Sequence, residues 1–563
     1  EMKRYIFTSI VLGLLSMSLN AQNQEEKEYN ESVIMRSSFS PVVSEAYKLS
    51  DKPTVLESEF RLPPFRYDKE GKRFQTTMTF ENIKPAKVKG EPIARLYNTH
   101  LKAAIGTYFS SLIDASYSQT RSKDFIYALN FKHKSSLGQI KDYANSSYAN
   151  NDLNLYAKKI WKSFSLDANL FYSHQRHYYY GFSDSVNKEK KDYRAQYHTV
   201  GTQINYTSLY KDENKLHNHA SFAVKHTSGK WGYGETDLLL NAGVSKQLTL
   251  FGDAPQLIGL DVTYEHIFGK YSAKDLTPFF NPILVLQEYK NVQGVVDIDA
   301  NIAFTLHDYA VYGSLSFVPG FGNKKPFLFL PTLIVTTPPI VENISIKGGL
   351  KSGYNLPTLQ SLVKENPYIA PNVHTDLESY TKIFALASYA GADNLHLGFE
   401  AGYDIIKNKY FYTLDKDAVL NNMFSLSYDN ANRFYIDFKF DYKLNNIVLR
   451  ANAMFQDVKT ANLKEAWYTP KFKADLAFEY TAADKFKIAF IPGFFSSMKC
   501  ENENGEIVKL KSGIDINLNA SYNYSDQLVF FVELNNLAFQ RYYEYYNYPS
   551  QRFVGLLGAR FAF

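Results

Sequence analysis

The chain has 563 residues, of which 45% are hydrophobic, and its mean hydropathy is −0.31. This average is too polar for a bundle of membrane helices, and beyond residue 21 no uninterrupted apolar stretch reaches the roughly 20 residues that a helical span needs. The net charge of +5, which falls to +4 without residues 1–21, is too small to indicate a nucleic-acid partner. The single cysteine, Cys500, excludes an internal disulfide framework.

Residues 1–21 have the layout of a secretory signal peptide. Lys3 and Arg4 precede an apolar run from Ile6 to Leu19, and Asn20-Ala21 offers a small residue for cleavage. The run is shorter than a transmembrane helix requires. We therefore predict export, with the mature chain beginning at Gln22.

Residues 22–95 form the next unit of the chain. They carry several prolines and mixed charges but no regular series of strands. Proline and charge disfavour a hydrophobic core, so we predict an extended N-terminal segment without a fold of its own. Two states remain open: the segment is mobile, or it threads into the domain that follows and partly blocks it.

From residue 96 onward, apolar and polar residues alternate with the period of two that is typical of β-strands. The alternation runs through 125–131, 164–172, 296–306, 395–405, 433–443, 447–456, 471–480 and 514–524. In 433–443, for example, Phe434, Phe438 and Tyr442 share one face, and Asp437 and Lys439 the other. The polar faces of the later strands supply our candidate lumen-lining residues, which are Asp437, Lys439, Asp441, Arg450, Lys473, Asp475, Glu479 and Asp515.

The strand pattern predicts an all-β fold, a membrane-spanning antiparallel β-barrel. Many runs reach the roughly 9 to 11 residues that a tilted membrane strand needs. The high aromatic content of 16%, chiefly 44 Tyr and 42 Phe, is expected where strands end in aromatic girdles. Dividing residues 96–563 into strands and connections gives about 22 strands, within a range of roughly 18 to 26. Short turns such as 444–446 alternate with long segments such as 457–470 and 496–512, so we expect short periplasmic turns and long extracellular loops.

The last eight residues, 556–563, continue the alternation and end on an aromatic residue. Gly558, Phe561 and Phe563 resemble the assembly signal of outer-membrane barrels, which is Gly-x-x-aromatic-x-aromatic. The resemblance implies an integral protein of the bacterial outer membrane. Outer-membrane lipid and the barrel assembly machinery are then its expected partners.

Two segments extend the resemblance to a family. Residues 355–362, followed by Asn366-Pro367-Tyr368-Ile369, and the final hairpin with 540–543 and 548–553 resemble motifs in the barrels of TonB-dependent receptors. Asn355-Leu356 departs from the Arg-Ala of the first motif, so the implied relation is remote. The family's plug is a folded domain about twice the size of residues 22–95. The resemblance therefore implies a receptor-like barrel without a recognisable plug.

Candidate chemistry is sparse. His174-x-x-His177, beside Tyr178, Tyr179 and Tyr180, and His217-x-His219 could each contribute metal ligands, but no Cys or carboxylate pattern completes either pair. Aromatic strand ends are ordinary at a membrane interface, and Asp297-x-Asp299 is typical of a hydrated lumen wall. We predict no catalytic, cofactor-binding or metal-binding residues, no cofactor and no enzyme activity.

Three function classes remain. The leading one is an outer-membrane barrel that transports or binds an unknown solute through a polar lumen. The second is a non-conducting structural or assembly component, docked to a protein partner in the outer membrane. The third, a membrane-embedded hydrolase, would need a Ser and His pair that the sequence alone does not establish.

Overall fold

The structure is a computed structural model that describes residues 96–119, 122–212, 214–252, 254–271, 289–341, 343–391 and 394–563. The predicted signal peptide and the predicted N-terminal segment, residues 22–95, lie outside the described residues. Among the residues that are described, no helix is long and apolar enough to cross a membrane.

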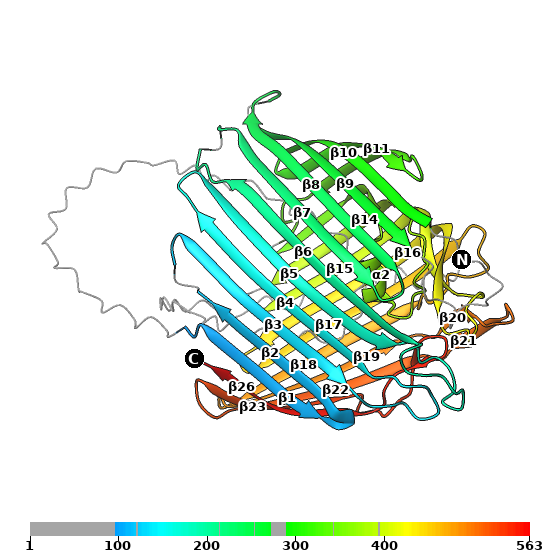
Figure 1. Cartoon of the computed structure of the whole chain (residues 1–563). Coiled ribbons are helices and arrows are strands. Elements are labelled where there is room, and N and C mark those ends of the chain that lie inside the picture. The colour runs from blue at the N-terminus through cyan, green and yellow to red at the C-terminus, as the bar shows by residue number, and fades with distance from the viewer. Residues whose placement is uncertain are drawn as a thin grey trace, which may run out of the picture. The chain divides into compact units, whose positions relative to one another are not determined.

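Twenty-two strands form one antiparallel sheet that closes on itself (Figure 1). Each strand of this sheet pairs with the sheet's next strand along the chain, and β1 (Thr99–Gly106) pairs with both β2 (Ser110–Ser118) and β26 (Val554–Ala562). At this junction Thr99 and Phe563 each donate a backbone N–H to the other's carbonyl, at 3.0 Å. Closure leaves this described 22-strand sheet without an unpaired edge strand. The predicted barrel and its predicted strand number are confirmed.

The strands coincide with the alternating runs of the sequence. Residues 433–443 lie within β16 (Phe424–Leu444), and 447–456 lie within β17 (Ile447–Thr460). The remaining barrel strands are β3 (Phe125–Ser136), β4 (Tyr148–Ile160), β5 (Phe164–Tyr178), β6 (Arg194–Ser208), β7 (His217–Gly229), β8 (Tyr233–Leu248), β9 (Gln256–Tyr271), β10 (Tyr289–Leu306), β11 (Tyr309–Gly322), β12 (Phe327–Thr336), β13 (Ile344–Asn355), β14 (Glu378–Gly391), β15 (Leu395–Leu414), β18 (Phe472–Ala482), β19 (Phe486–Phe495), β22 (Gly513–Asn523) and β23 (Leu528–Asn535).

Connections differ between the two ends of the barrel. At the end where β1 begins and β26 finishes, the strands are joined by short turns such as Asn445-Asn446. The opposite end, called the long-loop end below, carries most of the long segments, as the sequence predicts. These contain a short helix, α2 (Leu359–Glu365), and two small hairpins, β20 (Met498–Glu501) with β21 (Ile507–Leu510) and β24 (Tyr543–Tyr545) with β25 (Tyr548–Pro549). A 3-10 turn, η1 (Thr107–Phe109), makes the short connection between β1 and β2 at the same end.

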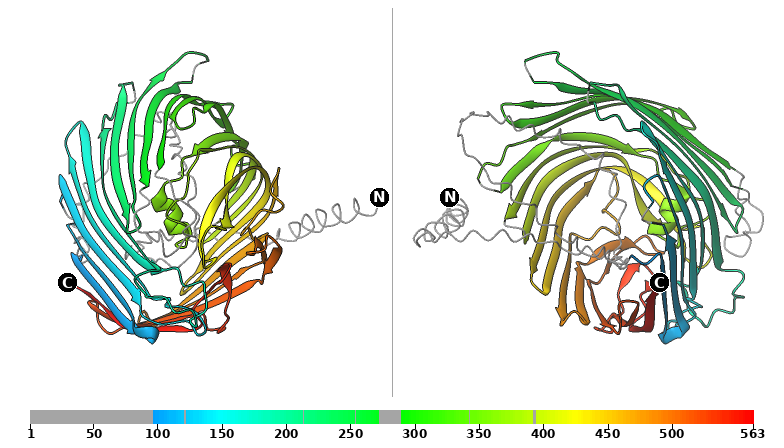
Figure 2. Two further views of the ribbon diagram at one scale, coloured as in Figure 1. Left: turned by 45° about the vertical axis from the view of Figure 1, so that its right-hand side comes forward. Right: turned by 90° about the vertical axis from the view of Figure 1, so that its left-hand side faces the viewer.

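Helix α2 lies inside the ring of strands (Figure 2). Its start is fixed by a capping box, in which the Thr358 side chain accepts from the Ser361 backbone and the Ser361 side chain accepts from the Thr358 backbone. Leu359, Leu362 and Val363 follow the i, i+3, i+4 spacing of one helix face and are buried. The segment 356–377 therefore folds into the barrel interior.

Contacts of this segment identify the inward face of the wall. The Leu359 N–H donates to Glu235 Oε1 at 2.6 Å, and Lys225 Nζ donates to Thr358 Oγ1 at 3.3 Å. Residues paired across a ladder share a face, so the register extends this assignment around the sheet. The outward face is apolar and exposed, with Leu170 at 49% and Ile298 at 42%.

Candidate functional site

The inward face of β16 to β22 carries the predicted lumen residues. The register places Asp437, Lys439 and Asp441 of β16 on the same face as the contacts of α2. The same face continues through Arg450 of β17, Lys473, Asp475 and Glu479 of β18, and Asp515 of β22. The lining of a water-filled lumen by these side chains stays a prediction.

Several of these charges are linked to one another. Arg450 lies between two carboxylates, with Nη1 2.7 Å from Glu479 Oε1 and Nε 3.7 Å from Asp441 Oδ1. Lys487 Nζ lies 2.8 Å from Glu479 Oε2, and Lys439 Nζ lies 3.7 Å from Asp437 Oδ2. A wall of alternating cations and anions can hold polar solutes without a strong preference for one sign of charge.

On the opposite part of the wall, the side chains of Asp297-x-Asp299 and His217-x-His219 also point inward. Asp299 accepts from Ser316 Oγ at 2.6 Å and from Asn301 Nδ2 at 3.0 Å. His219 of the His217-x-His219 pair lies 3.0 Å from Asp261 Oδ1. In the part of the chain that the structure describes, no group of three or more His, Cys, Asp or Glu side chains is placed to hold a metal ion.

At the long-loop end, the loops and adjoining strand ends share a buried core, called the loop cap below. Tyr179, Leu359, Leu362, Ile369, Met423 and Phe424 are completely buried in it. Its other buried members are Ile140, Ala144, Tyr178, Tyr180, Phe182, Tyr193, Ala195, Tyr197, Trp231, Tyr233, Tyr271, Val363, Ala370, Val373, Phe411, Tyr412, Leu414, Ala418, Ala431, Trp467, Tyr468, Met498, Cys500, Leu510 and Tyr548.

Hydrogen bonds join loops from nearly opposite sides of the ring. Asn422, between β15 and β16, donates from Nδ2 to the carbonyl of Tyr179, between β5 and β6, at 2.7 Å. The Tyr548 hydroxyl, near β26, donates to the Asn422 carbonyl at 2.5 Å. The Tyr179 hydroxyl donates to the Ile369 carbonyl at 2.9 Å. The loops therefore meet across the interior of the barrel.

Tyrosine chemistry suits this arrangement. Burial raises the pKa values of Tyr179 and Tyr548 well above the ordinary value, so both hydroxyls stay neutral hydrogen-bond donors. The Tyr368 and Tyr548 rings stack with centroids 3.5 Å apart and an interplanar angle of 14°. The Tyr179 and Tyr548 rings contribute apolar area, while their hydroxyls donate to the buried carbonyls of Ile369 and Asn422.

The cap changes the interpretation of two sequence features. The aromatic run beside His174-x-x-His177 is typical of an interface girdle, yet Tyr179 is buried in the cap and Tyr180 is only 8% exposed. The receptor-like segment 355–369 supplies α2 and Ile369, which are central to the cap. The sequence contained one signal of this, the many tyrosines in predicted loops, but their meeting depends on loops far apart in the chain.

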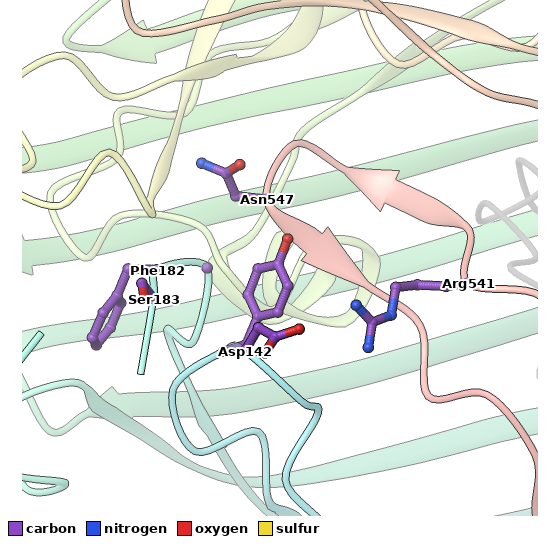
Figure 3. A pocket seen from close by; sticks show the side chains of 7 residues that line it. Asp142, Phe182, Ser183, Arg541 and Asn547 are labelled. Carbon is purple, nitrogen blue, oxygen red and sulfur yellow. The ribbon is translucent and has the colours of Figure 1, made fainter. Parts of the chain in front are cut away.

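A pocket of about 430 Å³ opens beside the loop cap (Figure 3). The Arg541 guanidinium and the Asp142 carboxylate point toward one another across it. Arg541 Nη2 lies 3.5 Å from the Lys141 carbonyl, and Arg541 Nε has no hydrogen-bond partner among the described residues. The remaining lining residues are Tyr143, Gly181, Phe182, Ser183 and Asn547.

Two of the residues that line the pocket are sequence neighbours of residues in the loop cap. Asn547 precedes Tyr548, and Gly181 follows Tyr180. A Cβ on Gly181 would lie 2.8 Å from the Tyr548 ring, so this position needs glycine for the close approach of the two loops. Burial and the neighbouring Tyr543 hydroxyl raise the pKa of Tyr143, which leaves a neutral hydroxyl at the pocket wall. A cation, an anion and neutral hydroxyls together suit a small polar ligand.

No known family model and no curated protein sequence matches the chain. Solved structures with the same fold do exist. The FrpB iron transporter from Neisseria meningitidis has 11% identity and a TM-score of 0.64, over 84% of this chain and 82% of that chain. The siderophore receptor PirA from Acinetobacter baumannii has 11% identity and a TM-score of 0.62, over 83% and 80%. The ferric enterobactin receptor PfeA from Pseudomonas aeruginosa, a mutant form, has 12% identity and a TM-score of 0.60, over 83% and 81%. At these identities the likeness establishes the barrel fold.

Proposed function

We propose that the chain is an integral outer-membrane protein of receptor type. It captures a small polar solute at the Arg541 pocket and passes it along the inward charged wall when the loop cap moves. The observation that carries this proposal is that hydrogen bonds among Asn422, Tyr179 and Tyr548 bridge the barrel at the long-loop end. The wall inside the barrel has a polar inward face. The fold shared with an iron transporter and siderophore receptors supports it.

The outward face supports the membrane location. This face exposes many Leu, Ile, Val and Phe side chains around the barrel. Such a continuous apolar surface is unfavourable in water, whereas lipid accommodates it. The terminal strand fits the same location, because Phe561 and Phe563 are exposed on the outward face, where an interface girdle would lie. Gly558 lies against the Ala103 carbonyl, where a Cβ would approach to 2.3 Å. The role of these three residues as an assembly signal stays a prediction.

Arg541 indicates the chemistry of the solute. Its guanidinium presents several donors in a planar fork that suits a carboxylate or a phosphate. Asp142 on the other side of the pocket accepts from a hydroxyl or an amine. We therefore propose a solute that carries an acidic group together with hydrogen-bond donors.

A thermal-shift screen of the purified full chain tests solute binding, with carboxylate sugars, phosphate sugars and neutral sugars as probes. A ligand at 100 times its Kd stabilises the folded state by about 2.7 kcal/mol. Arg541→Gln should abolish the shift, and Arg552→Gln, an exposed arginine outside the pocket, should leave it unchanged. A stoichiometric protein partner in a mild-detergent pull-down, with no shift for any acidic probe, would replace the receptor function by the structural one.

A further inference from the structure

A band of polar side chains lies on the outward face of β3 to β6, close to the long-loop end. It lies where the apolar part of this face gives way to polar side chains, and neither the pocket nor the inward wall includes it. We call it the rim band. Its members are His133, Asn151, His174, Arg176, Arg194, Gln196 and His198.

The register places these residues side by side on the outward face. His133 pairs with Asn151, Asn151 with His174, and His174 with His198. Val200 lies two residues from His198 on the same strand face and is 50% exposed. In the next row toward the opposite end of the barrel stand Phe131, Leu153, Tyr172 and Val200. The rim band therefore marks the border where the apolar outward face ends.

Hydrogen bonds hold the band in one arrangement. His133 Nδ1 lies 2.7 Å from Asn151 Oδ1, and Asn151 Nδ2 lies 3.0 Å from His174 Nδ1. Gln196 Nε2 connects the two following imidazoles, at 3.0 Å from His174 Nε2 and 3.2 Å from His198 Nε2. The His174 and His198 rings stack with centroids 4.7 Å apart. A polar network that spans four strands is pre-organised for a ligand larger than a single ion.

The charge on this face has one sign. The register gives the outward positions of β2 to β8 no Asp or Glu residue. Arg176 and Arg194 lie on adjacent strands of the band, since Arg176 pairs with Gln196 and Arg194 with Tyr178. The Nε atom of each is buried without a hydrogen-bond partner among the described residues. Two guanidinium groups near the end of an apolar face attract an anion.

We propose that the rim band binds the phosphorylated headgroup of a lipid in the outer leaflet. A solute in the lumen cannot reach this face, whereas headgroups lie at the depth where the apolar face ends. The two arginines would hold the phosphate, and the imidazole and amide groups would hold hydroxyl and carbonyl oxygens of the headgroup. This proposal rests on the proposed membrane location and is independent of the solute in the Arg541 pocket.

Native mass spectrometry of the delipidated full chain tests the proposal. Three probes are added in detergent: lipid A with two phosphates, lipid A from which the phosphates have been removed, and phosphatidylethanolamine. We expect one or two molecules of phosphorylated lipid A to be retained in preference to the other probes. Inorganic phosphate in millimolar excess should not displace them, because the neighbouring acyl chains contribute to binding.

The double variant Arg176→Gln, Arg194→Gln should weaken retention roughly 10- to 30-fold, as expected from two lost cations near a membrane surface. The matched control is Lys159→Gln, which removes an outward cation at the other end of β4. If the double variant does not yield a folded barrel, Arg194→Gln alone should weaken retention by a few-fold. Equal retention of phosphorylated and dephosphorylated lipid, or equal loss in the Lys159→Gln control, would overturn the proposal. So would a protein that covers the rim band in place of lipid.

Discussion

Asn422→Ala should loosen the loop cap without weakening the barrel. Asn422 is 1% exposed, and its Nδ2 group donates to the Tyr179 carbonyl from the far side of the ring. Alanine removes this donor and leaves the Tyr179 carbonyl buried. The Tyr548 hydroxyl still has its acceptor, because it donates to the backbone carbonyl of residue 422. The substitution therefore removes one contact between loops and keeps the strand ladders intact.

The expected magnitude follows from the loss of one buried hydrogen bond. Leaving a buried acceptor without a donor costs about 1 to 3 kcal/mol. If this cost falls on the closed cap and is relieved when the cap opens, the opening equilibrium shifts by about 5- to 150-fold. The melting temperature of the barrel should change little, since the wall has 22 paired strands that the substitution does not touch.

Single-channel recordings in planar bilayers measure this directly. We expect small or intermittent conductance for the wild type and a higher open probability for Asn422→Ala. Asn241→Ala is the matched control, because among the described residues the Asn241 side chain donates within the wall, to Thr263 Oγ1 at 2.8 Å. Removal of residues 22–95 in both backgrounds separates any blocking by that segment from blocking by the cap. Identical recordings for wild type and Asn422→Ala, with unchanged protease resistance of the loops, would show that this hydrogen bond does not hold the cap closed.

Three further predictions test other parts of the molecule. Phe438→Arg, on the outward face of β16, should impair assembly by about 2 to 4 kcal/mol, whereas Lys439→Ala on the inward face should be mild; equal yields of heat-modifiable barrel would reverse the assigned faces. Deleting Phe563, or replacing it with a charged residue, should lower the yield of inserted, protease-resistant barrel, because the closing strand loses an outward aromatic residue, and the deletion also removes the backbone pairing with Thr99; normal yield would contradict the proposed signal. Burial raises the pKa of Asp415 to about 6, above its unfolded value of about 3.9, so its loop should lose stability as pH rises between these values; Asp415→Asn should remove this dependence in limited proteolysis, and a pH profile unchanged by the substitution would count against it.

The loop cap shows where local sequence patterns stop being informative. Tyr179, Tyr368 and Tyr548 lie in three different connections between strands. The sequence around each of them is that of an ordinary loop turn or of an aromatic residue at a membrane interface. Their shared environment arises because the loops fold inward from separate positions around the ring. The rim band could be predicted in part from the sequence, because the alternation of side chains along β5 places His174 and Arg176 on the same face as Leu170. Only the register across β3 to β6 joins them to His133 and His198.

Side-chain alternation along the chain was enough to predict the barrel, a strand number near 22 and the two faces of the wall, because alternation is a local property of extended backbone and a closed sheet is what satisfies its edges. The spacing of the connections likewise predicted short turns opposite long loops. No local pattern predicted that α2 enters the interior, that loops from opposite sides bond through Asn422, or that Arg541 meets Asp142 across a pocket. These contacts join residues hundreds of positions apart, and their energies come from burial and hydrogen bonding that no short segment encodes.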